Sequence, residues 1–197
     1  GTRFWPYSRK NNPKQLLNIV GDHSMLQITV DRLRKLKSTS EIYIITRKEL
    51  YNSILDTTKN IKPENIIIEP SAKNTAPAIA LVAQKIYMEE KNATMGVFPA
   101  DHLIVGHNNF EKSLGNAFSI SEKEQSLVTI GIKPTYPSTG YGYIQYERNA
   151  TKGLGYHVKT FAEKPHETLA KRFIKSGDFL WNAGIFVWKV NTLLSSL

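Results

Sequence analysis

The chain has 197 residues, contains no cysteine and carries a formal net charge of +9. Its 41% hydrophobic and 22% charged residues exclude a disordered chain, and no apolar run approaches the ~20 residues that span a bilayer, so no membrane partner is expected. The lack of cysteine excludes disulfide bonds and thiolate metal sites and favours a cytoplasmic location, whereas the positive charge favours an anionic partner.

The first 132 residues alternate predicted helices and predicted strands. Residues 1–15 carry glycine, proline and an Asn-Asn pair without a period, which is typical of a loop. The helix over residues 22–37 begins with Asp22 or Ser24 as its cap, and its basic end at residues 32–37 is assigned to structure because a helix C-terminus favours cations. Further helices are predicted over 47–55, 75–91 and 110–123, and strands over 42–46, 65–69, 94–98 and 127–132.

The strands of this part are continuous apolar runs, which indicates that both of their faces are covered. This pattern predicts an α/β fold with a mixed, mostly parallel central sheet flanked by helices. Beyond Pro134 the pattern changes, because residues 143–147 and 156–163 alternate apolar and polar side chains and predict a small β-meander. A helix over 165–176 and a strand over 185–190 follow. Without a repeat or linker, we expect one domain over residues 1–197.

Three polar segments of the first half lie where ligands bind in open α/β sheets, near the carboxyl ends of strands. The basic loop at residues 1–9, continued by Lys14, is either an exposed loop or a phosphate-binding loop. Glu69 ends a strand, and Asn74 is either the cap of the next helix or a group that reads a base edge. Asp101 either caps the next element or holds Mg²⁺, which prefers oxygen, so the neighbouring His102 is assigned to structure.

Three polar segments of the second half have similar alternatives. Gly142 lies in a Gly-rich segment that forms either a hairpin turn or a close approach of a ligand to the backbone. Glu163 and Lys164 form either an exposed ion pair or an acceptor for sugar hydroxyls beside a cation for a phosphate. Asn182 offers an amide to a sugar within an otherwise apolar run. No aromatic-interleaved basic stripe runs through the chain, so nucleic acid is not expected as a partner.

Taken together and in order, these segments resemble the sugar nucleotidyltransferase family, and within it the mannose-1-phosphate guanylyltransferases. The resemblance extends over nearly the whole chain. The segment that is most particular to the guanylyl branch joins Glu69-Pro70 to residues 74–79. The matching blocks are Gly1-Thr2-Arg3, Trp5-Pro6, Ser8-Arg9, Pro13-Lys14-Gln15, Glu69-Pro70, and residues 74–79, 99–102, 140–144, 161–165 and 181–186.

The resemblance implies a Rossmann-like nucleotidyltransferase domain that joins GTP and mannose 1-phosphate into GDP-mannose and diphosphate. It implies that Arg3 and Lys14 are catalytic and grip the triphosphate, and that Asp101 is catalytic and holds Mg²⁺. The nucleotide would lie against Gly1, Thr2, Arg3, Lys14, Glu69 and Asn74. Mannose 1-phosphate would be bound by Gly142, Glu163, Lys164 and Asn182.

The family's first strand and C-terminal part have no counterpart in this sequence. We therefore expect little or no turnover from these 197 residues alone, and the oligomeric state of the intact protein stays open. Alternatives are a nucleotidyltransferase for glucose 1-phosphate or UTP, a ligand-binding module that has lost catalysis, and a nucleic-acid binder.

Overall fold

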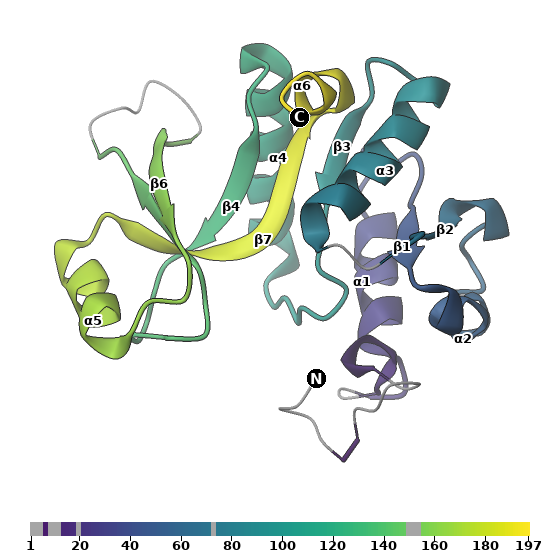
Figure 1. Cartoon of the computed structure of the whole chain (residues 1–197), viewed down its shortest axis with the longest axis horizontal. Coiled ribbons are helices and arrows are strands. Elements are labelled where there is room, and N and C mark those ends of the chain that lie inside the picture. The colour runs from purple at the N-terminus through teal and green to yellow at the C-terminus, as the bar shows by residue number, and fades with distance from the viewer. Residues whose placement is uncertain (1–5, 8–12, 19–20, 72–73, 149–154) are drawn as a thin grey trace. The chain divides into compact units, whose positions relative to one another are not determined.

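The computed structural model describes residues 6–7, 13–18, 21–71, 74–148 and 155–197. The chain divides into two compact units, whose elements are labelled in Figure 1. Unit 1 comprises Gly1–Lys91 and Pro99–His107, and unit 2 comprises Asn92–Phe98 and Asn108–Leu197. The expectation of one domain over residues 1–197 stays a prediction.

Unit 1 is built around two parallel strands. Strand β1 pairs with β2, and Ile44 lies opposite Ile66. The strands are short and apolar, and each is followed by polar residues at the same edge of the pair. The elements are a 3-10 turn at Lys14–Leu16, α1 (Met25–Arg34), β1 (Ile44–Thr46), a 3-10 turn at Lys48–Leu50, α2 (Tyr51–Thr57), a 3-10 turn at Pro63–Asn65, β2 (Ile66–Ile68) and α3 (Thr75–Glu89).

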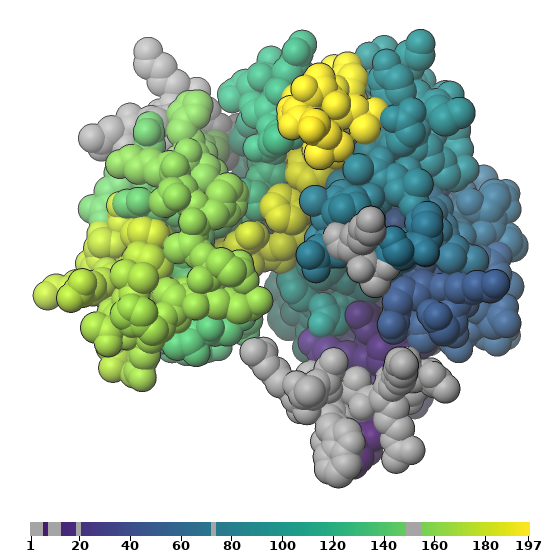
Figure 2. Space-filling model, in the orientation of Figure 1, coloured from purple at the N-terminus to yellow at the C-terminus, as the bar shows by residue number. Residues whose placement is uncertain are grey.

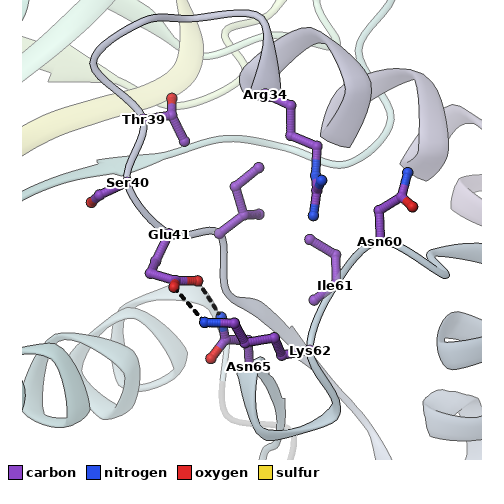
Figure 3. A pocket seen from close by; sticks show the side chains of 9 residues that line it. Arg34, Thr39, Ser40, Glu41, Asn60, Ile61, Lys62 and Asn65 are labelled. Atoms are coloured by element: carbon purple, nitrogen blue, oxygen red, sulfur yellow. Dashed lines mark hydrogen bonds and ion pairs between the residues drawn. The ribbon is translucent and has the colours of Figure 1, made fainter.

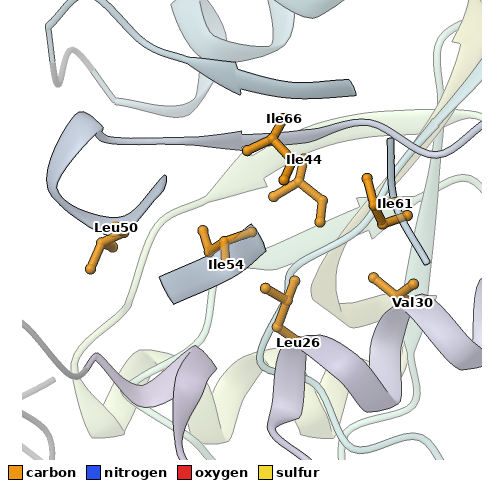
Figure 4. Packing of buried hydrophobic residues seen from close by; sticks show 7 residues of the cluster. All are labelled: Leu26, Val30, Ile44, Leu50, Ile54, Ile61 and Ile66. Carbon is orange, nitrogen blue, oxygen red and sulfur yellow. The ribbon is translucent and has the colours of Figure 1, made fainter. Parts of the chain in front are cut away.

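Helix α1 begins at a polar cap and packs one apolar face into the core of unit 1. The hydroxyl of Ser24 accepts a hydrogen bond from the backbone N–H of Gln27 at 3.1 Å, so Ser24 is the N-cap and the choice between it and Asp22 is settled. Burial of each large apolar side chain in such a cluster stabilises the fold by about 1.5–3 kcal/mol. The cluster comprises Leu26, Val30, Ile44, Leu50, Ile54, Ile61 and Ile66 (Figure 4), and the partly buried Ala100 packs against it.

Unit 2 is built around the long strand β7, which is the yellow strand of Figure 1. Strands β3, β4 and β5 each pair with β7 in the antiparallel sense, so these three strands run in the same direction, and β6 pairs with β5. Val187 near the C-terminal end of this strand and Val190, the first residue after it, are fully buried. The elements are β3 (Thr94–Val97), α4 (His107–Glu124), β4 (Val128–Ile132), β5 (Tyr143–Tyr146), β6 (Val158–Ala162), α5 (Glu167–Ser176), β7 (Phe179–Lys189) and α6 (Val190–Leu194).

The predicted order of helices and strands and the α/β class are confirmed. Among the described residues, the parallel pairing is that of β1 with β2, whereas the pairings of the five-stranded sheet around β7 are antiparallel. One predicted boundary is wrong, because β7 begins at Phe179 rather than at residue 185. Phe179–Trp181 is apolar and pairs with β5, and the strand then continues through Asn182, Ala183 and Gly184, which has a φ of 65°. The polar and small residues at 182–184 interrupt the apolar pattern, which is why the predicted strand begins only after them. In the part of the chain that the structure describes, no helix has the length and apolarity needed to cross a bilayer.

Candidate active site

Two residues that are far apart in the sequence, Lys14 and Asp101, form an ion pair in unit 1. The Lys14 ammonium lies 2.9 Å from Oδ2 of Asp101 and 3.4 Å from its backbone oxygen. Lys14 belongs to the 3-10 turn before α1, and Asp101 follows Ala100, which packs on the core of unit 1. Their side chains are 29% and 32% exposed, so the pair is half-buried and still reachable from solvent. The fold therefore prepares a cation and a carboxylate side by side at a surface.

The donor set at Asp101 fits a cation that arrives with a phosphorylated substrate. Among the described residues, no group of three or more His, Cys, Asp or Glu side chains is placed to hold a metal by itself. Mg²⁺ commonly takes only one or two protein carboxylates and fills its other positions with phosphate oxygens and water. Asp101 therefore offers one carboxylate of the kind that such a cation takes, and it supplies no closed metal cage.

His102, the neighbour of Asp101, is best described as a neutral structural residue. Burial lowers the pKa of its imidazole, and the nearby cations Lys14 and Arg32 lower it further, against the opposing effect of Asp101. The backbone oxygen of His102 accepts a hydrogen bond from Nη1 of Arg32 at 3.3 Å. The imidazole thus adds no positive charge at neutral pH, in agreement with its assignment to structure.

A cavity of about 480 Å³ opens at the carboxyl edge of the β1–β2 pair. Arg47 follows β1 and Glu69 follows β2, and since Thr46 and Ile68 are the last paired residues, Arg47 and Glu69 lie next to each other in register. The backbone N–H of Glu69 also donates to the oxygen of Thr46 at 2.8 Å, which extends the pairing by one residue. The cavity is lined by Ile45, Arg47, Glu69, Asn74, Thr75 and Ala78.

Asn74 borders this cavity in an unusual backbone conformation. Its φ of 69° and ψ of −174° lie outside the regions that most side chains adopt, and its side chain makes no capping hydrogen bond to α3. Strain of this kind persists where the surroundings fix the backbone, and it occurs often at ligand sites. The geometry therefore speaks against the capping alternative and leaves the amide at the cavity.

In unit 2, three neighbouring strands bring Gly142, Glu163 and Asn182 together. Tyr143 pairs with Ala162 of β6 and with Trp181 of β7, and the backbone N–H of Asn182 donates to the oxygen of Gly142 at 2.8 Å. A Cβ atom added at Gly142 would lie 3.2 Å from Oε2 of Glu163 and 3.7 Å from Cβ of Asn182. A side chain at position 142 would therefore fill the space between the other two residues.

Lys164 completes this group as the ion-pair partner of Glu163. Its ammonium lies 2.8 Å from Oε1 of Glu163, and the two side chains are 61% and 76% exposed. Lys164 has a φ of 34°, which turns the chain away from β6 toward α5. The green atoms of β6 and α5 form part of the exposed surface of unit 2 in Figure 2, and Phe161 on β6 is also exposed.

Comparison with known proteins identifies the family of the chain. Residues 1–196 match the family model described as Nucleotidyl transferase. The chain belongs to this family. It is 39% identical over 205 residues to a mannose-1-phosphate guanylyltransferase of Escherichia coli, with the whole of this chain and 44% of that relative covered. The chain therefore spans less than half the length of this curated relative.

Two solved structures share the fold of this nucleotidyl transferase. A structure from Thermus thermophilus, described as a mannose-1-phosphate geranyltransferase, is 27% identical with a TM-score of 0.88, over 98% of this chain and 55% of that chain. A structure from Helicobacter pylori, described as a mannose-6-phosphate isomerase, is 32% identical with a TM-score of 0.81, over 95% of this chain and 70% of that chain. The resemblance seen in the sequence blocks is thus confirmed at the level of the family.

The structure brings some of the predicted site residues together and leaves others undescribed. Lys14 meets Asp101, Glu69 and Asn74 line one cavity, and the four residues assigned to mannose 1-phosphate gather around Gly142. Gly1, Thr2 and Arg3 lie outside the described residues, so their contacts with the triphosphate stay predictions.

Sequence reasoning missed Arg47. A single arginine after a short strand looks like an ordinary exposed residue, and only the pairing of β1 with β2 brings it beside Glu69. Its position directly after β1, which matches that of Glu69 after β2, was the available signal.

A second cavity, of about 370 Å³, lies at the amino ends of β1 and β2 (Figure 3). Within it, Glu41 contacts Nζ of Lys62 at 2.7 Å and accepts a hydrogen bond from the Asn65 amide at 2.9 Å, so these groups already satisfy one another. No residue that the sequence singled out as a site residue lines this cavity. Ligands in open α/β sheets bind at the opposite edge, which favours the cavity at Glu69.

Proposed function

We propose that the protein is a mannose-1-phosphate guanylyltransferase that forms GDP-mannose and diphosphate from GTP and mannose 1-phosphate. The observation that carries this proposal is the ion pair of Lys14 and Asp101, which joins two predicted site residues across 87 positions of the sequence. The similarity over the whole chain to the guanylyltransferase of E. coli supports the same reaction.

The reaction needs countercharge and positioning rather than a protein nucleophile. A phosphate oxygen of mannose 1-phosphate attacks the α-phosphorus of GTP, a new P–O bond forms, and the bond from the α-phosphorus to the bridging oxygen breaks. The electron pair of that bond leaves on diphosphate. Since both substrates are anions, the catalyst must hold them in line and offset their negative charge.

Lys14 and Asp101 divide this task in our proposal. The ammonium of Lys14 stabilises the charge that develops on the departing diphosphate, and Arg3 is expected to assist it. The carboxylate of Asp101 would hold Mg²⁺, which when bound supplies countercharge to the phosphate oxygens. The contact of 2.9 Å between the two side chains keeps both charges in place before substrate arrives.

The cavity at Glu69 and Arg47 matches the hydrogen-bonding edges of guanine. Guanine presents acceptors at O6 and N7, which an arginine can donate to, and donors at N1 and N2, which a carboxylate can accept from. Uracil offers no such set of two donors beside an acceptor. The neighbouring positions of Glu69 and Arg47 in one cavity at this edge of the sheet therefore favour GTP over UTP in our proposal.

The sugar end is assigned to the group around Gly142. The carboxylate of Glu163 and the amide of Asn182 would bond mannose hydroxyls, and Lys164 would bind the sugar phosphate. The absence of a side chain at Gly142 leaves room for the sugar beside the backbone, because a Cβ atom there would come within 3.2 Å of Glu163.

The test measures GDP-mannose and diphosphate formation by the full-length protein with mannose 1-phosphate and with GTP, UTP or ATP in turn. We expect GTP to be preferred, and Glu69→Gln to reduce that preference by about 1–3 kcal/mol of discrimination, or roughly 5- to 150-fold. The control is Glu64→Gln, an exposed glutamate before β2 at the other end of the strand. Equal rates with UTP, or an equal loss in both variants, would reject the guanine assignment.

A further inference from the structure

One helix of unit 1 contacts both segments that supply the Lys14–Asp101 ion pair. At its first residue, the backbone N–H of Met25 donates to the oxygen of Leu17 at 3.2 Å, which ties down the segment that carries Lys14. Seven residues later, Nη1 of Arg32 donates to the backbone oxygen of His102 at 3.3 Å. With a rise of about 1.5 Å per residue, helix α1 holds these two attachment points roughly 10 Å apart along its axis.

The guanidinium of Arg32 is held in a defined position. Arg32 is 8% exposed, and its Nη2 donates to the hydroxyl of Thr29, one turn earlier on α1, at 3.2 Å. Thr29 is itself 4% exposed. Arg32 thus makes one hydrogen bond to its own helix and another to the backbone of a distant segment. Because the guanidinium is planar and rigid, these two bonds have fixed directions relative to each other, whereas a lysine ammonium would not fix them.

Burial of a cation costs desolvation free energy, which a position at the surface avoids. Burial lowers the pKa of Arg32, but an arginine remains charged in proteins, so the cost of removing this charge from water is borne by the folded state. Arg34, two residues along the same helix, is exposed and carries the same charge. The basic end of α1 is therefore not uniform, and the interpretation of residues 32–37 as cations at a helix C-terminus accounts for Arg34 but not for Arg32.

We propose that Arg32 is a positioning residue that fixes the Asp101–His102 segment against α1 and so sets the carboxylate of Asp101 for its cation. The proposal rests on the proposed function in one respect, namely that Asp101 holds a divalent cation. Arg32 acts through the backbone of His102 and does not touch substrate. Loss of its hydrogen bond should therefore weaken cation binding at Asp101 and leave the affinity for the sugar phosphate unchanged.

The experiment uses the full-length protein with Arg32→Lys, Arg32→Met, Asp101→Asn and the control Arg34→Met. Binding of Mn²⁺ in the presence of GTP is followed by electron paramagnetic resonance, folding by thermal unfolding, and turnover by kcat and KM at several Mg²⁺ concentrations. We expect Arg32→Lys to unfold cooperatively, to bind Mn²⁺ about fivefold or more weakly, and to need correspondingly more Mg²⁺. We expect its KM for mannose 1-phosphate, and every property of Arg34→Met, to match the unsubstituted protein.

The outcomes separate a positioning role from a merely structural one. Unchanged Mn²⁺ binding in Arg32→Lys, with only a lower unfolding temperature, would overturn the proposal, as would Mn²⁺ binding that does not depend on Asp101. If both Arg32 variants fail to fold, Thr29→Val decides, because it removes the hydroxyl that orients the guanidinium and keeps the charge. Normal Mn²⁺ affinity in a folded Thr29→Val protein would then reject the proposal, and weaker binding would support it.

The proposed function can fail separately. Mn²⁺ binding that depends on Asp101 and Arg32, together with no formation of GDP-mannose, would remove the guanylyltransferase assignment and leave the role of Arg32 intact. GDP-mannose formation with unchanged Mn²⁺ binding in Arg32→Lys would support the guanylyltransferase assignment and reject the positioning role of Arg32.

Discussion

The two units each present a lysine–carboxylate pair, and the two pairs are built in opposite ways. Lys14 and Asp101 are 87 residues apart and half-buried, and they are supported by helix α1 and by Ala100, which packs against the core. Glu163 and Lys164 are neighbours in the sequence, and both are more than 60% exposed. The first pair exists only in the folded chain, whereas the second needs little more than a local turn.

This difference predicts that the two lysines affect different steps of the reaction. An exposed ion pair is screened by water and contributes little by itself, so we expect Lys164 to exchange Glu163 for a substrate phosphate at little cost. A half-buried pair is fixed before substrate binds, and such preorganised charge acts most strongly on the transition state. We therefore expect Lys14 to affect the chemical step and Lys164 to affect binding.

The largest expected effect comes from exchanging the two lysines for methionine, one at a time, in the full-length protein. Lys14→Met should lower kcat by about 10²–10³-fold, as the loss of a preorganised charge does in other sites. Lys164→Met should raise KM for mannose 1-phosphate roughly tenfold, which corresponds to about 1.5 kcal/mol for a hydrogen bond to a charged group. Steady-state kinetics with both substrates measures both effects.

The control for this comparison is Lys171→Met, which removes an exposed lysine that pairs with Glu167 on α5. It should leave both kinetic constants unchanged. If Lys14→Met alters only KM, or if Lys164→Met lowers kcat as strongly as Lys14→Met, the contrast between the two pairs is wrong.

A smaller effect is expected from Gly142→Ala at the exposed pair. The new Cβ atom would lie 3.2 Å from Oε2 of Glu163, which is tight, but the Glu163 side chain is exposed and can move away. We expect a cost at the low end of overpacking, about 1 kcal/mol, and hence about a fivefold higher KM for mannose 1-phosphate with little change in kcat. Gly115→Ala on α4 is the matched control, because nothing lies within 4 Å of its added Cβ atom. A similar KM in both variants would show that Gly142 is not close to the sugar.

The sequence predicted well what local patterns decide. Helices and strands follow from short-range periodicity, so their order could be read residue by residue, and Ser24 was one of two predicted caps for α1. The association of Lys14 with Asp101 depends on contacts over 87 residues, and it came from the family resemblance rather than from any local pattern.

What escaped prediction depends on tertiary contacts. Arg47 gains its place beside Glu69 only through the register of two strands. Arg32 has the same local sequence signal as Arg34, and only packing makes one buried and the other exposed. Strand β7 continues without a break through Asn182 and Gly184 because its first residues pair with β5, and this pairing is not visible in the local sequence.

The pairs Lys14–Asp101 and Glu163–Lys164 differ both in their separation along the sequence and in their burial. A third pair in unit 1 shows which of these two properties matters. Tyr43 donates a hydrogen bond to Oε2 of Glu89 on α3 at 2.6 Å, so this pair is distant in the sequence like Lys14–Asp101 and exposed on its carboxylate side like Glu163–Lys164. Partial burial, and next the hydrogen bond to Glu89, raises the pKa of Tyr43 from 10.0 to about 12. If burial determines how much a pair contributes to the unfolding free energy, the hydrogen bond of Tyr43 should contribute little at neutral pH.

The expected effect of this third pair is the smallest, and it is confined to alkaline solution. Between pH 10 and about pH 12 the unfolded chain has released the Tyr43 proton and the folded chain still holds it, so the folded state binds more protons and its stability falls as pH rises. Below pH 10 both states hold the proton, so stability no longer changes with pH through this group. Tyr43→Phe should flatten the decline in unfolding free energy over this range, which unfolding measured at several pH values checks. The comparison uses the loss of unfolding free energy at neutral pH. If this loss is as large in Tyr43→Phe as in Lys14→Met, separation along the sequence rather than burial determines how much such a pair contributes to stability.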